Sequence, residues 1–151
     1  MEIKLYDCET SAQAVTKVCY NEKTRNLNFR IECKDLQDLK KCVEIIKSYN
    51  NFDWMLINNN LPIYTDFENE KGSLLTYEIG RESSPVIYIK WCPIVVSPRT
   101  KVEYVAKDDK LLTFTQEEFE KNIRALAAIT FASECQFEED GMYNVCRLWW
   151  D

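Results

Sequence analysis

The stretch Leu27-Asn28-Phe29-Arg30-Ile31-Glu32-Cys33 decides the fold, because its apolar and polar residues alternate one by one. Successive side chains of a strand point to opposite faces, so this pattern predicts a strand with one buried face and one solvent-exposed face. The period then changes. After a capping residue, Asp35, apolar residues recur at three- and four-residue steps as far as Tyr49, which predicts an amphipathic helix. A half-buried strand followed by such a helix is typical of an α+β fold.

The rest of the sequence predicts a second helix and several further strands. A second helix is predicted from Thr115, with Glu118 completing a capping box and with Phe114 and Phe119 at the positions of a hydrophobic staple. Its half from 125 to 132 is apolar on nearly all sides and is expected to be enclosed. Further strands, separated by turn signals, are predicted at 3–5, 14–20, 52–57, 63–67, 74–79, 86–96, 102–106 and 142–150.

These elements predict a single α+β domain over residues 1–151. We expect a mainly antiparallel, twisted sheet with two helices packed against it. The chain is long enough to bury a core without disulfides or metals, since a domain of about 150 residues hides roughly 70% of its unfolded surface.

The balance of charge argues against several classes of partner. The chain carries 25 acidic and 19 basic side chains, a net charge of −6, and the basic residues are scattered. Binding to phosphates requires clustered Lys and Arg, so we expect neither direct nucleic-acid binding nor attraction to an anionic membrane. No segment approaches the ~20 apolar residues that cross a bilayer. A protein partner with a basic surface is favoured instead.

The seven cysteines indicate a reducing compartment. Their number is odd and no two of them form a Cys-x-x-Cys pair, so neither a disulfide scaffold nor a zinc site is indicated. Met1 to Leu5 lacks the apolar run of a signal peptide, and we expect a cytoplasmic protein with free thiols. Cys33 lies just before a helix, where a thiol can be activated, but the alternation places it on the buried face.

Candidate catalytic groups are few. The sequence has no histidine, which removes the commonest general base, the Ser-His and Cys-His nucleophile pairs and most transition-metal sites. Residues 66–72 resemble half of a calcium loop, but Lys71 stands where the glycine belongs and Tyr77 where the bidentate glutamate belongs. We therefore predict no catalytic residues, no metal and no cofactor.

Two features suggest a contact surface. Trp149 and Trp150 are adjacent in a predicted strand, so one of them is expected to enter the core and the other needs a cover or a partner. Glu138, Glu139 and Asp140 form an acidic run in a predicted turn beside that strand. We predict that these five residues contact a basic partner.

The resulting hypothesis is a small acidic protein-binding inhibitor, of the immunity or counter-defence type, that blocks a basic effector by stoichiometric binding. Two alternatives remain open. The first is a hydrolase or transferase that uses carboxylates or cysteine, and the second is a small-ligand-binding or chaperone-like module. A deep pocket with convergent polar groups would favour the enzyme.

Overall fold

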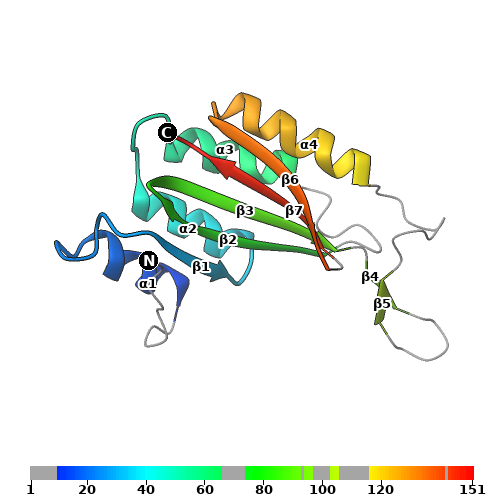
Figure 1. Ribbon diagram of the computed structural model, residues 1–151, viewed down its shortest axis with the longest axis horizontal. Helices are drawn as coiled ribbons and strands as arrows, with labels where there is room; N and C mark the ends of the chain where they lie inside the picture. The colour runs from blue at the N-terminus through cyan, green and yellow to red at the C-terminus, as the bar shows by residue number, and fades with distance from the viewer. Residues whose placement is uncertain (1–9, 66–73, 93, 97–102, 106–115, 142) are drawn as a thin grey trace.

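The computed structural model describes residues 10–65, 74–92, 94–96, 103–105, 116–141 and 143–151 (Figure 1). The predicted α+β class is confirmed, although the described residues form four helices where two were predicted. In chain order the elements are α1 (Ser11–Cys19), β1 (Phe29–Cys33), α2 (Leu36–Ile46), α3 (Trp54–Tyr64), β2 (Leu74–Glu82), β3 (Ser84–Cys92), β4 (Ile94–Val96), β5 (Glu103–Val105), α4 (Gln116–Ile129), β6 (Glu134–Asp140) and β7 (Tyr143–Trp149).

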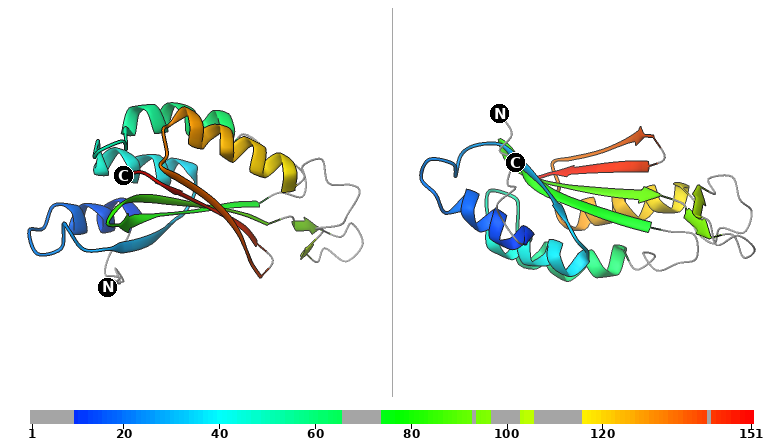
Figure 2. Two further views of the ribbon diagram at one scale, coloured as in Figure 1. Left: turned by 45° about the horizontal axis from the view of Figure 1, so that its top comes forward. Right: turned by 90° about the horizontal axis from the view of Figure 1, so that it is seen from below.

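The main sheet has five strands in the order β1-β2-β3-β7-β6, and each neighbouring pair is antiparallel. Strands β2 and β3 form one long hairpin, and β6 and β7 form a second hairpin at the other edge. The sheet is strongly twisted (Figure 2). Strands β4 and β5 form a separate two-stranded sheet. The predicted antiparallel architecture is therefore present.

The core lies between one face of the main sheet and helices α2, α3 and α4 (Figures 1 and 2). Helix α1 packs beside α2 at the β1 edge. In β1 the predicted alternation holds, with Phe29 and Cys33 buried. The largest fully buried side chains are Trp91, Trp150, Tyr77, Phe29, Phe52 and Phe119.

Side-chain caps set the starts of the first three helices. Asp35 accepts a hydrogen bond from the amide of Asp38, which confirms the predicted start of α2. Thr10 and Gln13 form a capping box on α1, so the prediction of a strand at 14–20 was wrong. Asp53 caps α3, and the strands predicted at 52–57 and 63–67 are replaced by this helix as far as it is described.

Helix α4 matches the second predicted helix, with Phe119, Ile123 and Leu126 buried. The proposed cap Thr115 and staple residue Phe114 lie outside the described residues, as does the strand predicted at 3–5. The prediction that residues 125–132, the second half of this helix, are enclosed was wrong, because Ile129 and Phe131 are exposed.

The segment after α4 holds a strand that the sequence analysis missed. Strand β6 includes Glu138, Glu139 and Asp140, which were predicted to lie in a turn. Among the described helices none is long and apolar enough to span a membrane.

Gly80 is required for the pairing of β1 with β2. A Cβ atom there would collide with the carbonyl oxygen of Phe29 and lie 3.0 Å from the Cα of Arg30, both backbone atoms of β1. Replacing Gly80 by Ala is therefore expected to lower the free energy of unfolding by about 3 kcal/mol, the upper range for overpacking, as measured by denaturant titration.

Gly141 provides the matched control for this substitution. It has a φ of 61° with open space around its Cα, so Gly141→Ala strains the local backbone without a collision. We expect a cost of about 1 kcal/mol. Equal costs at the two glycines would contradict the close approach of β1 and β2.

Candidate functional site

The two adjacent tryptophans face opposite sides of the sheet, as predicted. Trp150 is 1% exposed and packs edge-on against Phe52, with ring centroids 5.3 Å apart. Its indole Nε1 donates a hydrogen bond of 2.9 Å to the carbonyl oxygen of Thr130, at the end of α4. Trp149 is half-buried on the other face and donates through Nε1 to the carbonyl oxygen of Glu82. Trp150 is thus a core residue, and Trp149 is the member of the pair that a partner can reach.

The acidic run is exposed but does not share a corner with Trp149. Strand β6 pairs Glu138 with Val145 and Asp140 with Tyr143, near the tip of the β6–β7 hairpin. Trp149 is four residues beyond Val145 along β7, which corresponds to ~13 Å at the rise of a strand. The predicted contact residues therefore lie at opposite ends of the hairpin.

Paired charges cover part of the sheet face that carries Trp149. Arg147 bridges Glu82 and Glu134, with N–O distances of 2.7 and 2.6 Å. The hydroxyl of Tyr88 donates to Glu82, and burial, aided by that carboxylate, raises the pKa of Tyr88 to about 12. These groups satisfy one another, so this part of the face is stabilised from within the chain.

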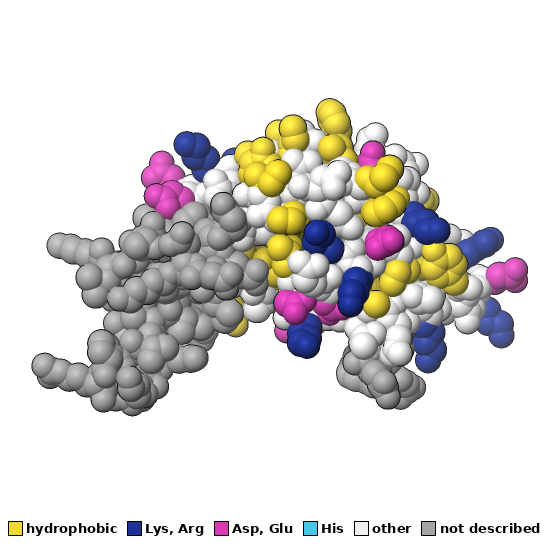
Figure 3. Space-filling model, turned by 180° about the vertical axis from the view of Figure 1, so that it is seen from behind, with side chains coloured by type: hydrophobic (Ala, Val, Ile, Leu, Met, Phe, Trp, Pro, Cys, Tyr) yellow, Lys and Arg dark blue, Asp and Glu magenta, His cyan; other side chains and the backbone are white. Residues whose placement is uncertain are grey.

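Exposed apolar side chains occur at the end of α4. Figure 3 shows the helix side of the molecule, where apolar side chains gather along the upper rim, over α3 and the end of α4. Ile129 is 44% exposed and Phe131 is 70% exposed. Helix α4 runs antiparallel to α3, so its end lies toward the start of α3, where Met55 is also exposed. This apolar end was not anticipated from the sequence.

The backbone at Phe131 has an unusual conformation. The amide of Phe131 donates to the carbonyl of Ala128, and the amide of Ala132 donates to that of Ala127. This pair of bonds is a Schellman motif, in which the residue after the C-cap adopts a left-handed conformation that normally selects glycine. Phe131 occupies that position with a φ of 59°. An aromatic residue is therefore held in a conformation that disfavours it by ~1–2 kcal/mol, and its ring is directed to solvent.

A small pocket lies at the opposite end of α4. Its volume is about 80 Å³, and the residues that line it come from the start of α4 and from β6 and β7. They are Gln116, Glu120, Phe137, Glu138, Glu139 and Asn144. Two residues of the predicted acidic run thus take part in a concave site. The described part of the chain contains no cluster of three or more His, Cys, Asp or Glu that could hold a metal ion.

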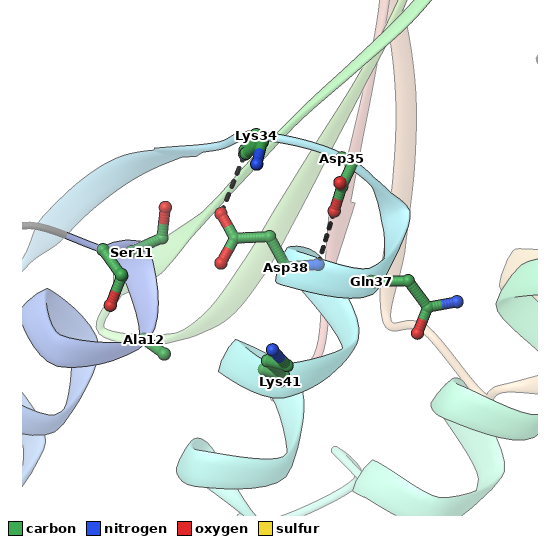
Figure 4. Close-up of a pocket in the computed structure, with 8 residues that line it drawn as sticks. Ser11, Ala12, Lys34, Asp35, Gln37, Asp38 and Lys41 are labelled. Atoms are coloured by element: carbon green, nitrogen blue, oxygen red, sulfur yellow. Dashed lines mark hydrogen bonds between the residues drawn. The ribbon is translucent and has the colours of Figure 1, made fainter.

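A larger hollow of about 370 Å³ lies where α1 and α2 begin (Figure 4). The backbone amide of Lys34 donates to the carboxylate of Asp38, and the amide of Asp38 donates to Asp35. These carboxylates occupy helix N-terminal donors that would otherwise attract an anion. These two donors in the lining of the hollow are thus occupied by carboxylates of the chain itself.

A second hollow, of about 410 Å³, contains two arginines, Arg25 and Arg81. A guanidinium nitrogen of Arg81 donates to the carbonyl oxygen of Arg25, and the ring of Phe29 lies 5.7 Å from its central carbon. Arg81 thus already has partners within the chain, and the side chain of Arg25 is exposed.

The described cysteines are Cys19, Cys33, Cys42, Cys135 and Cys146, and all five are free thiols. The sulfur atoms of Cys135 and Cys146 are 3.9 Å apart. The hydrogen bond between them lowers the pKa of the Cys135 thiol and raises that of Cys146, whose burial acts in the same direction. The charge of Arg124 also lowers the pKa of Cys135, while burial and the charge of Glu120 oppose this shift.

Comparison of this chain with protein-family models, with curated proteins and with solved structures finds no match in any of the three.

Proposed function

We propose that this protein is a stoichiometric inhibitor that binds another protein and blocks it without catalysis. The observation that carries this proposal is Phe131, an aromatic ring 70% exposed and held in a left-handed conformation. The left-handed conformation opposes stability, and the exposed ring gains little burial in return. Glycine would remove the conformational cost. Strained residues cluster at functional sites, and aromatic side chains dominate the binding energy of protein interfaces. A contact made with a partner would offset this cost.

The charge of the chain supports a partner with a basic surface. The net charge is −6, and exposed acids lie along the edge strand β6 and the first turn of α4. Such charges speed the capture of a basic protein. An immunity or counter-defence protein that neutralises a basic effector fits these features. Five free thiols support a reducing, cytoplasmic setting.

The proposal is tested by capturing the partner on immobilised protein. We expect a basic protein to be retained at one-to-one stoichiometry by the wild type, to lose its activity in the complex, and to be lost from the Phe131→Ser variant. Tyr20, 63% exposed on the C-cap of α1, provides a control, and Tyr20→Ser is expected to retain the partner. Equal retention by both variants, or a captured protein that stays fully active, would contradict the proposal.

A further prediction concerns the acidic run. Replacing Glu138, Glu139 and Asp140 together by Ser is expected to slow association with the captured partner roughly tenfold at low salt, because surface charge acts mainly on association. The difference should shrink as salt shortens the Debye length below ~10 Å. Stopped-flow kinetics across ionic strength measure this effect. An association rate equal to that of the wild type at low salt would contradict a role of these acids in binding. They would then serve only to protect the β6 edge from pairing with other strands.

A further inference from the structure

A buried side-chain amide near the tip of the β6–β7 hairpin lacks hydrogen-bond partners among the described residues. Asn144 is 3% exposed and lies on β7, in register with Glu139 of β6 and Trp91 of β3. Neither its Oδ1 nor its Nδ2 has a partner among the described residues. Buried polar atoms in folded proteins are almost always paired, so such an amide indicates a group that the isolated chain does not supply.

The cavity beside this amide limits the size of that group. Its volume of about 80 Å³ exceeds the space of a single water molecule and is far below the ~300 Å³ of a typical small-molecule site. Glu120, Glu139 and Phe137 line the same cavity, and the guanidinium of Arg124 lies over the ring of Phe137, 4.6 Å from its centroid. This lining suits a compact cation on an apolar stem.

We infer that this pocket receives a lysine side chain of the partner, an inference that rests on the proposed function. An ammonium group has three donors, and Asn144 Oδ1 and the carboxylate of Glu120 offer acceptors for them. The ring of Phe137 packs against its methylene stem. The Nδ2 group of Asn144 donates to a carbonyl oxygen of the inserted segment. The compact ammonium fits this volume better than the wider guanidinium of arginine.

The position of the pocket agrees with a single interface that also includes Phe131. Glu120 and Ile129, the last residue of α4, are nine positions apart, which is ~14 Å along the helix, and Phe131 follows in the turn that ends it. A standard interface of ~800 Å² on each partner spans this distance. The pocket would then fix the orientation of the partner, while Phe131 anchors it.

The pocket is tested without the partner, by titrating the isotope-labelled full chain with the methylamide of Nα-acetyl-lysine and following the amide signals by NMR. We expect saturable shifts at Asn144, Glu120 and Phe137, and no such shifts with the norleucine analogue, which keeps the stem but lacks the ammonium. The arginine analogue should bind more weakly. Asn144→Leu should lower affinity for the lysine analogue by ~tenfold or more, the range for a hydrogen bond to a charged group.

The stability of the variant provides an independent readout. Removing an unpaired buried amide is expected to raise the melting temperature of Asn144→Leu by roughly 2–4 °C while binding is lost. Glu120→Gln, at the partly exposed rim, tests the charge without disturbing the core and should weaken binding about threefold, as surface ion pairs do. The control Glu44→Gln, on α2, should bind like the wild type.

Each alternative outcome overturns either the inference or the proposed function. Equal shifts with the lysine and norleucine analogues would show a pocket that does not select charge, and the absence of shifts would show one filled by water. Stronger binding of the arginine analogue would assign the site to a guanidinium. If a partner is captured through Phe131 but the pocket does not bind the lysine analogue, this inference alone is overturned. A lysine-binding pocket with no Phe131-dependent partner would overturn the proposed function instead.

Discussion

Replacing Trp150 by Ala is expected to lower the free energy of unfolding by about 3–5 kcal/mol, the range for deleting a buried aromatic side chain. The side chain is 1% exposed and packs edge-on against Phe52. The substitution also leaves the carbonyl oxygen of Thr130 without the indole donor that now bonds it. Denaturant titration followed by circular dichroism measures the loss.

Two control variants separate the contributions to this loss. Trp150→Phe keeps most of the buried ring and removes the Nε1 donor, so we expect a cost of about 1–3 kcal/mol. Trp149→Ala, on the half-buried outer face, should cost less than Trp150→Ala. A larger loss at Trp149 than at Trp150 would reverse the assignment of the two residues to the outer face and the core.

Replacing Phe131 by Gly is expected to make the protein more stable and to weaken its binding to the partner. Glycine adopts the left-handed conformation freely, so the free energy of unfolding should rise by about 1 kcal/mol and the melting temperature by roughly 2–4 °C. The same change removes an exposed aromatic anchor. Loss of a hot-spot side chain costs about 2 kcal/mol or more, which corresponds to a roughly 30-fold weaker affinity.

A second variant distinguishes strain from contact. Phe131→Ala removes the ring but keeps a Cβ in the left-handed conformation, so its stability should stay within about 0.5 kcal/mol of the wild type, as at a surface position. Its affinity for the partner should fall as far as that of Phe131→Gly. If the ring instead stabilises the fold through its neighbours, both variants would be less stable than the wild type.

The sequence predicted those elements whose signals are local. The alternation in β1 and the Asp35 cap of α2 placed both elements within a few residues of their observed bounds. The opposite faces of Trp149 and Trp150 followed from the two-residue period of a strand. Each of these signals depends on neighbouring residues alone, so tertiary packing was not needed to interpret it.

The errors arose where local preferences conflicted. Val15, Thr16 and Val18 favour strands, yet the capping box of Thr10 and Gln13 starts a helix. The turn signals between the strands predicted at 52–57 and 63–67, which include Pro62, lie within α3, where Pro62 removes one backbone hydrogen bond, to the carbonyl of Asn58. In both cases caps and burial outweighed the residue propensities.

The most informative residues of the candidate site could not be predicted. Phe131 follows an apolar run and resembles a buried helix residue, because its exposure results from the Schellman turn that ends α4. Asn144 lies on the same face of β7 as the buried residues Cys146 and Leu148, and its lack of partners depends on the packing of α4 against the hairpin. The acidic run was found from its charge, but its place at the far end from Trp149 depends on the β6–β7 register.

The most direct test of the account is to measure melting temperature and partner affinity together for the Phe131→Gly variant, by calorimetry and by titration on the same preparations. We expect a melting temperature roughly 2–4 °C above that of the wild type and an affinity lower by roughly 30-fold. A variant that binds the partner as tightly as the wild type would contradict the account, whatever its stability.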